Sequence, residues 1–390
     1  MRTATLVIAA LIASGGAGCT STGPVRNVDL LIVGGTVIDP ASRTQSWNSG
    51  IAINDGIIVA LHASPDDFSA RARFNAGNQY ILPAFVDVRA HWDAGAVEES
   101  GQIEIDSRRS LYYGVTRVRN LMLLRATPAA SSPGDVRREI ARLVAAGADA
   151  IEVVASLTPE SLEAAILAAD EAQIPLALHV ASADELTVLQ EVRASTPLQA
   201  ITVTGPVDPT LYRQIGATQL FYVVSPNAAA GFADGAAAQS RLADPFLLET
   251  LSAGELDELQ QDYSLQTDEL RSVAGLDLTY DYARDAARSG AILLTGTDAG
   301  SPHMFAGYSV HEELWALADA GIEPVDVLAS ASSNAALLLG RQNNWGSIEA
   351  GHTADILVLK ANPLADIRNT RRISEVIKDG RIINRAGLLD

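Results

Sequence analysis

The chain has 390 residues, 48% of them apolar, and a formal net charge of −19 at pH 7. This length and composition allow a large buried core, and they fit one large domain with a smaller companion better than several small domains. The acidic balance argues against nucleic acid or an anionic membrane surface as a partner, because both need clustered Lys and Arg. We therefore expect a globular protein of enzyme size.

A positively charged start precedes an apolar run over 4–13, a pattern typical of a secretion signal and too short to cross a bilayer as a helix. The run closes on a Gly-Ala-Gly-Cys sequence that resembles a bacterial lipoprotein cleavage box, and its Cys19 is the only cysteine of the chain. We predict a signal peptide over 1–19, lipidation of Cys19, and a tether over 20–28. The protein would then be exported and attached by lipid alone to the periplasmic face of the outer membrane. Because Gly16 stands where lipoproteins usually carry Leu, a soluble periplasmic protein is the alternative.

Short apolar runs broken by turn residues follow over 29–80, for example at Ile51–Ile53 before an Asn-Asp-Gly turn. Such runs predict antiparallel strands joined by tight turns. The same pattern returns over 346–390, where Asp379-Gly380 separates two apolar runs. We predict that 29–80 and 346–390 form one small composite β-sandwich domain, and that 81–345 folds as a separate domain.

That intervening region alternates apolar runs with Ala-rich helical stretches, which is typical of a parallel α/β sheet or barrel. The predicted strands are Ile81–Val88, Val115–Arg119, Ala150–Ala155, Leu176–Val180, Ala200–Thr204, Gln219–Val224 and Ala291–Thr295. The predicted helices are Asp135–Ala146, Pro159–Ala172, Tyr280–Arg288 and Val310–Ala320. This set has seven strands, whereas a (β/α)8 barrel needs eight.

The most informative segment is 82–91, which reads Leu-Pro-Ala-Phe-Val-Asp-Val-Arg-Ala-His. It resembles the metal-binding strand of the amidohydrolase superfamily, Leu-Pro-Gly-x-x-Asp-x-His-x-His, in which the two His point to the same side and bind one cation. His91 matches the second His, and Arg89 stands at the first. Since Arg stays protonated and offers no lone pair, Arg89 cannot ligate a cation.

Later segments carry the same resemblance. Leu-Thr-Gly-Thr-Asp-Ala-Gly over 294–300 resembles the last barrel strand of the family, and 346–356 resembles the closing domain of its imidazolonepropionase-like members. The resemblance, which includes Xaa-Pro dipeptidase-like members, implies a (β/α)8 TIM-type barrel with its site at the C-terminal ends of the strands. Only a short Pro/Ser/Ala connection stands between Asn120 and Val136, where the family has its third strand. We therefore expect the barrel to be missing or reshaped around strand three.

In the family, a binuclear metal site uses the His pair, a carboxylated Lys, two more His and an Asp on the last strand. By this resemblance His91, His179 and Asp298 match metal ligands, and Asp298 also acts as general base toward a metal-activated water. Glu152 stands at the Lys position, where it can supply a bridging carboxylate. Thr204 stands at the strand-six His, and Thr is a poor zinc ligand. Each half-site has therefore lost one imidazole.

Further residues of the predicted site would bind substrate or support the ligands. Arg89 and Thr204 belong to this group through the positions they occupy. His303, shortly after Asp298, either reaches the mouth of the pocket or is an ordinary loop histidine.

Two functions from different classes fit these residues. The first is a hydrolase of an amide, peptide-like or related bond in a small-molecule or peptide-like substrate, with one divalent metal ion, Zn²⁺, held by the ligand set His91, His179, Glu152 and Asp298. The second is a catalytically silent, lipid-anchored binding protein in which Arg89 replaces the metal cation and pairs with Glu152 or Asp298, because buried carboxylates need a cation. A third possibility is metal-free acid/base chemistry in which Arg89 stabilises an oxyanion.

Overall fold

The computed structural model describes residues 25–47, 49–92, 101–124, 132–148, 150–153, 157–180, 187–188, 191–192, 198–202, 221–225, 240–265, 274–301 and 303–389. The predicted signal peptide, Cys19 and Thr204 lie outside these residues, and for His179 only the backbone is described. Within the described ranges, no helix is both long and apolar enough to cross a membrane.

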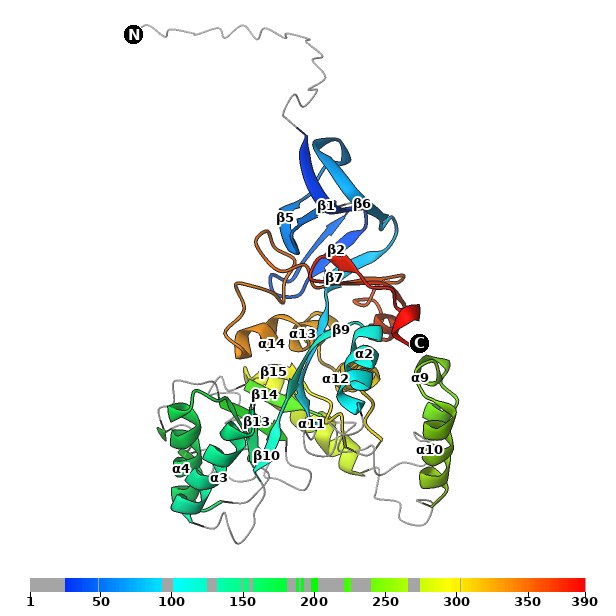
Figure 1. Ribbon diagram of the computed structural model, residues 1–390. Helices are drawn as coiled ribbons and strands as arrows, with labels where there is room; N and C mark the ends of the chain where they lie inside the picture. The colour runs from blue at the N-terminus through cyan, green and yellow to red at the C-terminus, as the bar shows by residue number, and fades with distance from the viewer. Residues whose placement is uncertain are drawn as a thin grey trace, which may run out of the picture.

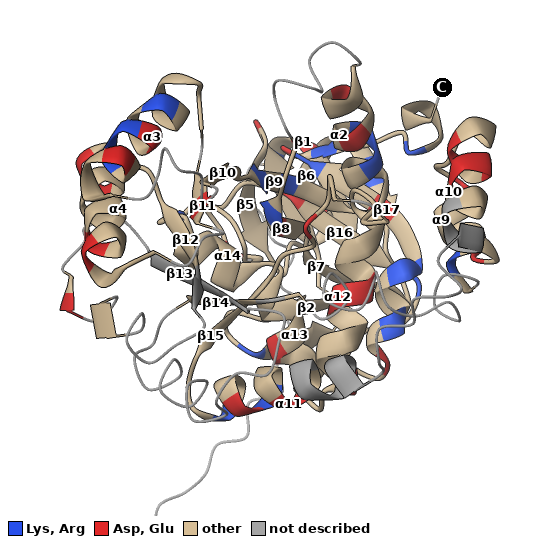
Figure 2. Cartoon of the chain, turned by 90° about the horizontal axis from the view of Figure 1, so that it is seen from below, with Lys and Arg blue, Asp and Glu red and all other residues tan. Residues whose placement is uncertain are grey.

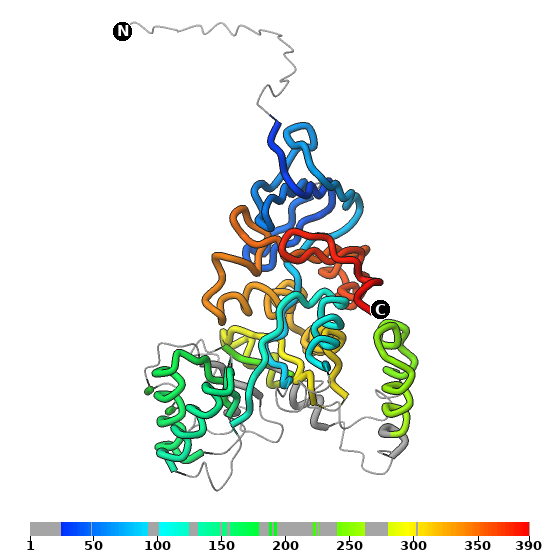
Figure 3. The backbone as a smooth tube through the Cα atoms, viewed as in Figure 1, coloured from blue at the N-terminus to red at the C-terminus, as the bar shows by residue number. Residues whose placement is uncertain are grey.

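Strands from both ends of the chain build two sheets, which lie together at the top of Figures 1 and 3. Their orders are β5-β4-β1-β6 and β18-β17-β16-β7-β2-β3. The bounds are β1 Arg26–Val33, β2 Thr36–Asp39, β3 Thr44–Trp47, β4 Ile51–Asn54, β5 Ile57–Leu61, β6 Phe68–Asn75, β7 Tyr80–Pro83, β16 Ile356–Leu359, β17 Ile373–Lys378 and β18 Arg381–Ile382. Because β7 pairs with β16, the N-terminal and C-terminal segments share one sheet. Since β1 begins at Arg26, the tether predicted over 20–28 extends too far.

Two of the hairpins in these sheets have two-residue turns. Asp55 and Gly56 join β4 to β5 with φ of 48° and 78°, and Asp379 and Gly380 join β17 to β18 with φ of 48° and 74°. Positive φ at both central residues is the type I′ pattern, which matches the twist of the flanking strands. Gly380 is also required by space, because a Cβ there would lie 2.8 Å from the Cα of Gly56. Between the sheets lies an apolar cluster that includes Ile32, Ile53, Ile81, Ile356 and Val358.

The segment predicted as one barrel strand, Ile81–Val88, is two strands in different sheets. β7 pairs with β16 in the upper part of the molecule, whereas β8 (Phe85–Ala90) pairs with β9 (Val115–Asn120) in the lower part. Between them, the N–H of Ala84 donates to the carbonyl of Asp355 at 3.0 Å. The prediction of a single strand is wrong because an uninterrupted apolar run does not mark the residue at which the chain changes sheets.

Parallel strands form the lower part of the molecule (Figure 1). After β8 and β9 come β10 Met122–Leu124, β11 Ile151–Val153, β12 Leu176–Val180, β13 Leu198–Thr202, β14 Phe221–Val224 and β15 Ile292–Thr295. They are hydrogen-bonded as the pair β8-β9 and as a six-stranded sheet in the order β10-β11-β12-β13-β14-β15. The α/β class is therefore confirmed, with a TIM-barrel-like arrangement of sequential parallel strands. In the described residues the hydrogen-bonded ladder does not close into a barrel.

The segment after β9 continues directly into the next strand, β10. β10 follows β9 after one residue, Leu121, whose N–H donates to the carbonyl of Ala90 at 2.8 Å. The next N–H, that of Met122, donates to the carbonyl of Ala150 at 3.0 Å. One extended segment thus pairs with β8 over its first part and with β11 over its last, and Figure 1 shows it running from β9 to β10. The sequence prediction missed β10.

Helices surround the parallel strands (Figure 2). Their bounds are α2 Gln102–Tyr112, α3 Pro133–Ala145, α4 Pro159–Glu171, α9 Pro245–Leu248, α10 Ala253–Leu265, α11 Ala274–Arg288, α12 Tyr308–Asp319, α13 Pro324–Ser330 and α14 Ser333–Leu338, with 3-10 turns η1 Pro65–Asp67, η4 Ile367–Arg371 and η5 Ala386–Leu388. The start of α3 is set by a capping box between Ser132 and Asp135 and by Pro133 in its first turn. Apolar faces of α3, α4, α11 and α12 pack against the strands in one large core.

Candidate active site

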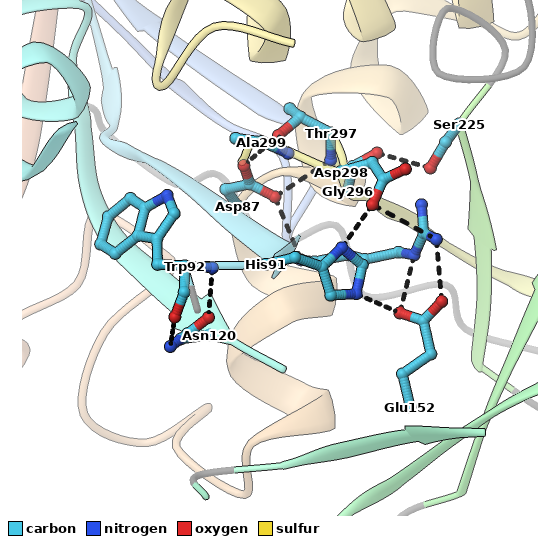
Figure 4. Close-up of polar contacts among 11 residues, drawn as sticks. Asp87, His91, Trp92, Asn120, Glu152, Ser225, Gly296, Thr297, Asp298 and Ala299 are labelled. Atoms are coloured by element: carbon cyan, nitrogen blue, oxygen red, sulfur yellow. Dashed lines mark hydrogen bonds and ion pairs between the residues drawn. The ribbon is translucent and has the colours of Figure 1, made fainter. Parts of the chain in front are cut away.

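Four polar side chains meet toward the C-terminal ends of the parallel strands. Arg89 belongs to β8, His91 follows β8, Glu152 belongs to β11, and Asp298 lies just after β15. Figure 4 shows the side chains of His91, Glu152 and Asp298 turned toward one another. Parallel strands bring residues far apart in sequence together at one edge, which is where barrels of this kind carry their sites.

Asp87 holds β8 against the chain that follows β15 (Figure 4). Its Oδ1 accepts the N–H groups of Arg89 at 3.0 Å and of Thr297 at 3.1 Å, and its Oδ2 accepts the hydroxyl of Thr297. Burial raises the pKa of Asp87 to about 6, although the hydrogen bonds from Thr297 and Arg89 oppose this effect. The Asp of the sequence motif therefore fixes the two segments that carry the site, a role that the sequence analysis did not assign.

The backbone after β15 runs close against the end of β8. The N–H of His91 donates to the carbonyl of Ala299 at 2.7 Å, and the N–H of Asp298 donates to the carbonyl of Arg89 at 2.8 Å. Gly300 has a φ of 102°, and a Cβ there would lie 2.2 Å from the carbonyl oxygen of His91, so glycine is required. Asp298 has a φ of 64°, a conformation that costs a non-glycine residue about 1 kcal/mol or more. Strain of this kind is often found at functional sites.

Arg89 binds the carboxylate of Glu152 through two parallel hydrogen bonds. Its Nε donates to Oε2 at 2.9 Å and its Nη2 to Oε1 at 2.8 Å. The exposed fractions of the two side chains are 8% and 0%, and Nη2 also lies 3.5 Å from Oδ1 of Asp298. Burial lowers the pKa of Arg89, but the charge and hydrogen bonds of Glu152, together with the charges of Asp298 and Asp87, outweigh burial and raise it. A bidentate, charge-assisted pair is the strongest contact these groups can make.

His91 lies between Glu152 and Asp298. Its Nε2 is 2.8 Å from Oε2 of Glu152, and its Nδ1 contacts Oδ1 of Asp298. Because ionised carboxylates only accept hydrogen bonds, both ring nitrogens donate and the ring is an imidazolium. Burial lowers the pKa of His91, but the hydrogen bonds to Asp298 and Glu152 outweigh burial and raise it. Burial raises the pKa of Asp298, yet the hydrogen bond from His91 and the charge of Arg89 bring it below its usual range. Two cations and two anions thus compensate one another.

The metal ion implied by the sequence resemblance does not fit these donors as they are arranged. Arg89 engages both oxygens of Glu152, and His91 uses both of its nitrogens on carboxylates. Within the part of the chain that the structure describes, no three His, Cys, Asp or Glu side chains are placed to hold a metal ion. A divalent ion would have to displace Arg89 from Glu152 and take a proton from His91. The assignment of a metal to His91, Glu152 and Asp298 therefore disagrees with the described geometry.

The remaining predicted residues are placed less completely. His179 lies in β12, where its backbone is opposite Ile201 of β13, and its side chain is outside the description, as is all of Thr204. His303 is buried in the loop after β15 and has a φ of 62°. Its position alone assigns it no role in the site.

Two supporting contacts escaped the sequence analysis. Asn120, at the end of β9, accepts the N–H of Trp92 at 2.7 Å and donates to the carbonyl of Trp92 at 2.8 Å, which fixes the chain just after His91 (Figure 4). The hydroxyl of Ser225 donates to the carbonyl of Gly296 at 2.6 Å. A polar residue at the end of a predicted parallel strand was the available signal for Asn120.

Comparison with known proteins identifies the family to which this chain belongs. The sequence model of the amidohydrolase family matches residues 130–383. This match covers more than half of the chain, and the chain therefore belongs to the amidohydrolase family.

Individual relatives are more distant. Ochratoxinase of Aspergillus niger is 28% identical over 107 residues, which is 26% of this chain and 22% of that protein. The crystal structure of the same ochratoxinase is 17% identical, with a TM-score of 0.65, over 90% of this chain and 95% of that one. Molinate hydrolase is 19% identical, with a TM-score of 0.68, over 93% and 96% of the two chains, and a Xaa-Pro dipeptidase is 17% identical, with a TM-score of 0.68, over 91% and 99%. At these identities the structural matches establish the fold.

Proposed function

We propose that the chain hydrolyses a carbon–nitrogen bond, amide or peptide-like, in a small-molecule or dipeptide-like substrate. Membership of the amidohydrolase family supports the reaction class, and relatives named as a hydrolase and as a Xaa-Pro dipeptidase support the type of substrate. The observation that carries the proposal is the contact of Asp298 with His91 at the strand ends. Asp298 is the most exposed member of the cluster, at 18% against 10% for His91.

The chemistry assigned to these residues is a proton transfer coupled to the attack of water. Asp298 orients a water molecule and accepts its proton while the water oxygen bonds to the substrate carbonyl carbon. Asp298 then passes the proton that it took from water to the leaving nitrogen as the carbon–nitrogen bond breaks, while His91 stays in contact with its carboxyl group. The products are a carboxylic acid and an amine, and the Asp298–His91 pair returns to its starting state. Arg89 and Glu152 hold the imidazole of His91 in position.

A second candidate function is ligand binding without turnover. It is favoured by the lowered pKa of Asp298, since a carboxylate that already accepts from His91 and lies close to Arg89 is a weak base. In that case a ligand would bind at the same strand ends. The four charged side chains of the cluster would then stabilise the pocket.

The experiment follows amine release from N-acyl amino acids and Xaa-Pro dipeptides by the mature chain after treatment with a chelator. We expect turnover that Asp298→Asn lowers by about 100-fold or more. Asp319→Asn is the matched control, because Asp319 is an exposed residue of α12 that pairs with Arg368. Activity that appears only after a divalent metal is added would contradict the metal-free chemistry. Absence of turnover, together with a substrate-dependent rise of the unfolding temperature, would establish the second candidate.

We also propose that the mature protein is held at a membrane by lipid on Cys19. The position of the only cysteine directly after a short apolar run supports this attachment. Cys19→Ser should move the protein from the membrane fraction to the soluble periplasmic fraction. Equal membrane retention of both forms would contradict the lipid attachment.

A further inference from the structure

We infer that Arg89 is the resident cation of this site and that it excludes a divalent metal ion. Arg89 and His91 stand two residues apart at the end of β8, so their side chains leave the strand on the same side. Both contact the same carboxylate, that of Glu152. Arg89 thus occupies the position at which the family resemblance implies an imidazole, and its guanidinium lies where a ligand of that type would have held the ion.

The geometry leaves little for a metal to bind. The carboxylate of Glu152 has no exposed surface, and a fully buried carboxylate requires a cationic partner. Arg89 supplies that partner with one donor to each oxygen, at 2.9 Å and 2.8 Å. A metal ion could bind Glu152 only if it displaced the guanidinium of Arg89, which is itself almost completely buried.

The surrounding backbone is built around the stem of Arg89. A Cβ at Gly296 would lie 2.5 Å from the Cβ of Arg89 and 2.9 Å from Cγ1 of Val223, so glycine leaves the space that this side chain occupies. The hydroxyl of Ser225 fixes the carbonyl of Gly296, and the N–H of Arg89 donates to Asp87. Arg89 is therefore held by its backbone, its stem and its charged end. This inference does not depend on turnover, because it concerns which cation compensates Glu152.

Metal content and metal titration test the inference without any substrate. The parent protein, purified without added metal, should contain well under one divalent ion per chain, and a chelator should leave its unfolding temperature unchanged. Arg89→His restores an imidazole and should bind Zn²⁺ or Co²⁺ at least about 100-fold more tightly than the parent, by calorimetry or by the visible absorption of Co²⁺. Arg89→Lys keeps a cation and should stay free of metal.

The control is Arg241→His, which alters another buried bidentate pair, that of Arg241 with Glu312. This variant should lose stability and gain no metal. A parent that holds about one ion per chain and is destabilised by a chelator would overturn the inference. So would an Arg89→His variant that folds and binds metal no better than the parent. If Arg89→His does not fold, the metal content of the parent and of Arg89→Lys decides the question.

Discussion

Two buried polar clusters of this molecule use the same residue types in different surroundings. At the strand ends, Arg89 holds Glu152 and His91 lies beside them. Around α12, Arg241 holds Glu312 through two bonds of 2.8 Å and 3.0 Å, and His311 precedes Glu312 in the helix. The difference lies in what each histidine faces. His91 contacts two carboxylates, whereas the ring of His311 is 3.0 Å from the hydroxyl of Thr370 and 2.9 Å from the carbonyl of Tyr113.

These partners decide the protonation of each imidazole. Burial lowers the pKa of His311 to about 3, with only partial opposition from the hydrogen bond to Tyr113. Burial acts in the same direction on His91, but its two carboxylate partners outweigh it. His311 is therefore a neutral packing residue, and His91 is a charged group that can move a proton. Burial lowers the pKa of both imidazoles, so burial does not distinguish the charged one from the neutral one. The distinguishing feature is the number of carboxylates that each imidazole contacts.

The largest effect should come from removing the glutamate of either cluster. Glu152→Ala and Glu312→Ala each leave a buried arginine without its carboxylate, and each should lower the free energy of unfolding by about 3–5 kcal/mol. Urea denaturation of both variants and the parent measures these losses. A loss below about 1 kcal/mol at one site and a large loss at the other would show that the two pairs are not equivalent in stability. The resemblance between the clusters would then be one of geometry only.

A pH series tests the neutral state of His311. The unfolded chain takes up this proton near pH 6.5 and the folded chain only near pH 3. The contribution to stability is therefore complete above about pH 6.5 and is lost as the pH falls toward 3, by about 3 kcal/mol between pH 7 and pH 4. The charges of Arg371 and Arg385 act in the same direction as burial.

The control for this pH series is His311→Gln, which keeps an N–H donor but does not titrate. Its free energy of unfolding at pH 7 should be lower than that of the parent, and its decline toward pH 4 should be smaller by the amount given above. Parallel declines of the two proteins would mean that His311 is not held neutral in the folded state.

The sequence predicted the fold class well and its strand boundaries less well. Alternating apolar runs and Ala-rich helices were sufficient for the α/β class, and the Asp-Gly turns were sufficient for the hairpins around Gly56 and Gly380. β10 was missed because a strand of three residues that follows another after Leu121 shows no separate periodicity. The change of sheet at Ala84 was missed because both neighbouring strands are apolar.

For the site, the sequence motifs were sufficient to group the residues but not to identify which residue pairs with which. Motif positions and strand ends pointed to Arg89, His91, Glu152 and Asp298 together. Sequence could not decide whether Arg89 pairs with Glu152 or Asp298, because that choice depends on where a side chain reaches in three dimensions. In the structure, Arg89 donates a hydrogen bond to each oxygen of Glu152, and Asp298 contacts His91.

A smaller loss of stability should result from changing either of two buried threonines, one next to each cluster. The hydroxyl of Thr297 donates to the carboxylate of Asp87 and accepts the N–H of Ala299 at 3.0 Å, whereas that of Thr370 bonds to the neutral ring of His311. Thr297→Val should cost about 2 kcal/mol and Thr370→Val about 1 kcal/mol, because hydrogen bonds to charged groups contribute more. Urea denaturation of the two variants measures the difference. Equal costs would argue that the charge of Asp87 is not what makes its contacts important.

The smallest effect should come from an exposed counterpart of the buried arginine–glutamate pairs. Arg43 contacts Glu323 at 2.7 Å and also contacts Asp326, with exposed fractions of 51%, 70% and 47% for the three side chains. Arg43→Ala should change the free energy of unfolding by less than about 1 kcal/mol, because water and salt screen such pairs. Arg43 has a φ of 55°, and since alanine also carries a Cβ, the substitution leaves the backbone strain unchanged. Measurements at low and high salt should show the small loss shrinking as salt rises. A loss of several kcal/mol that salt does not alter would mean that burial is not what distinguishes the Arg89 and Arg241 pairs from this one.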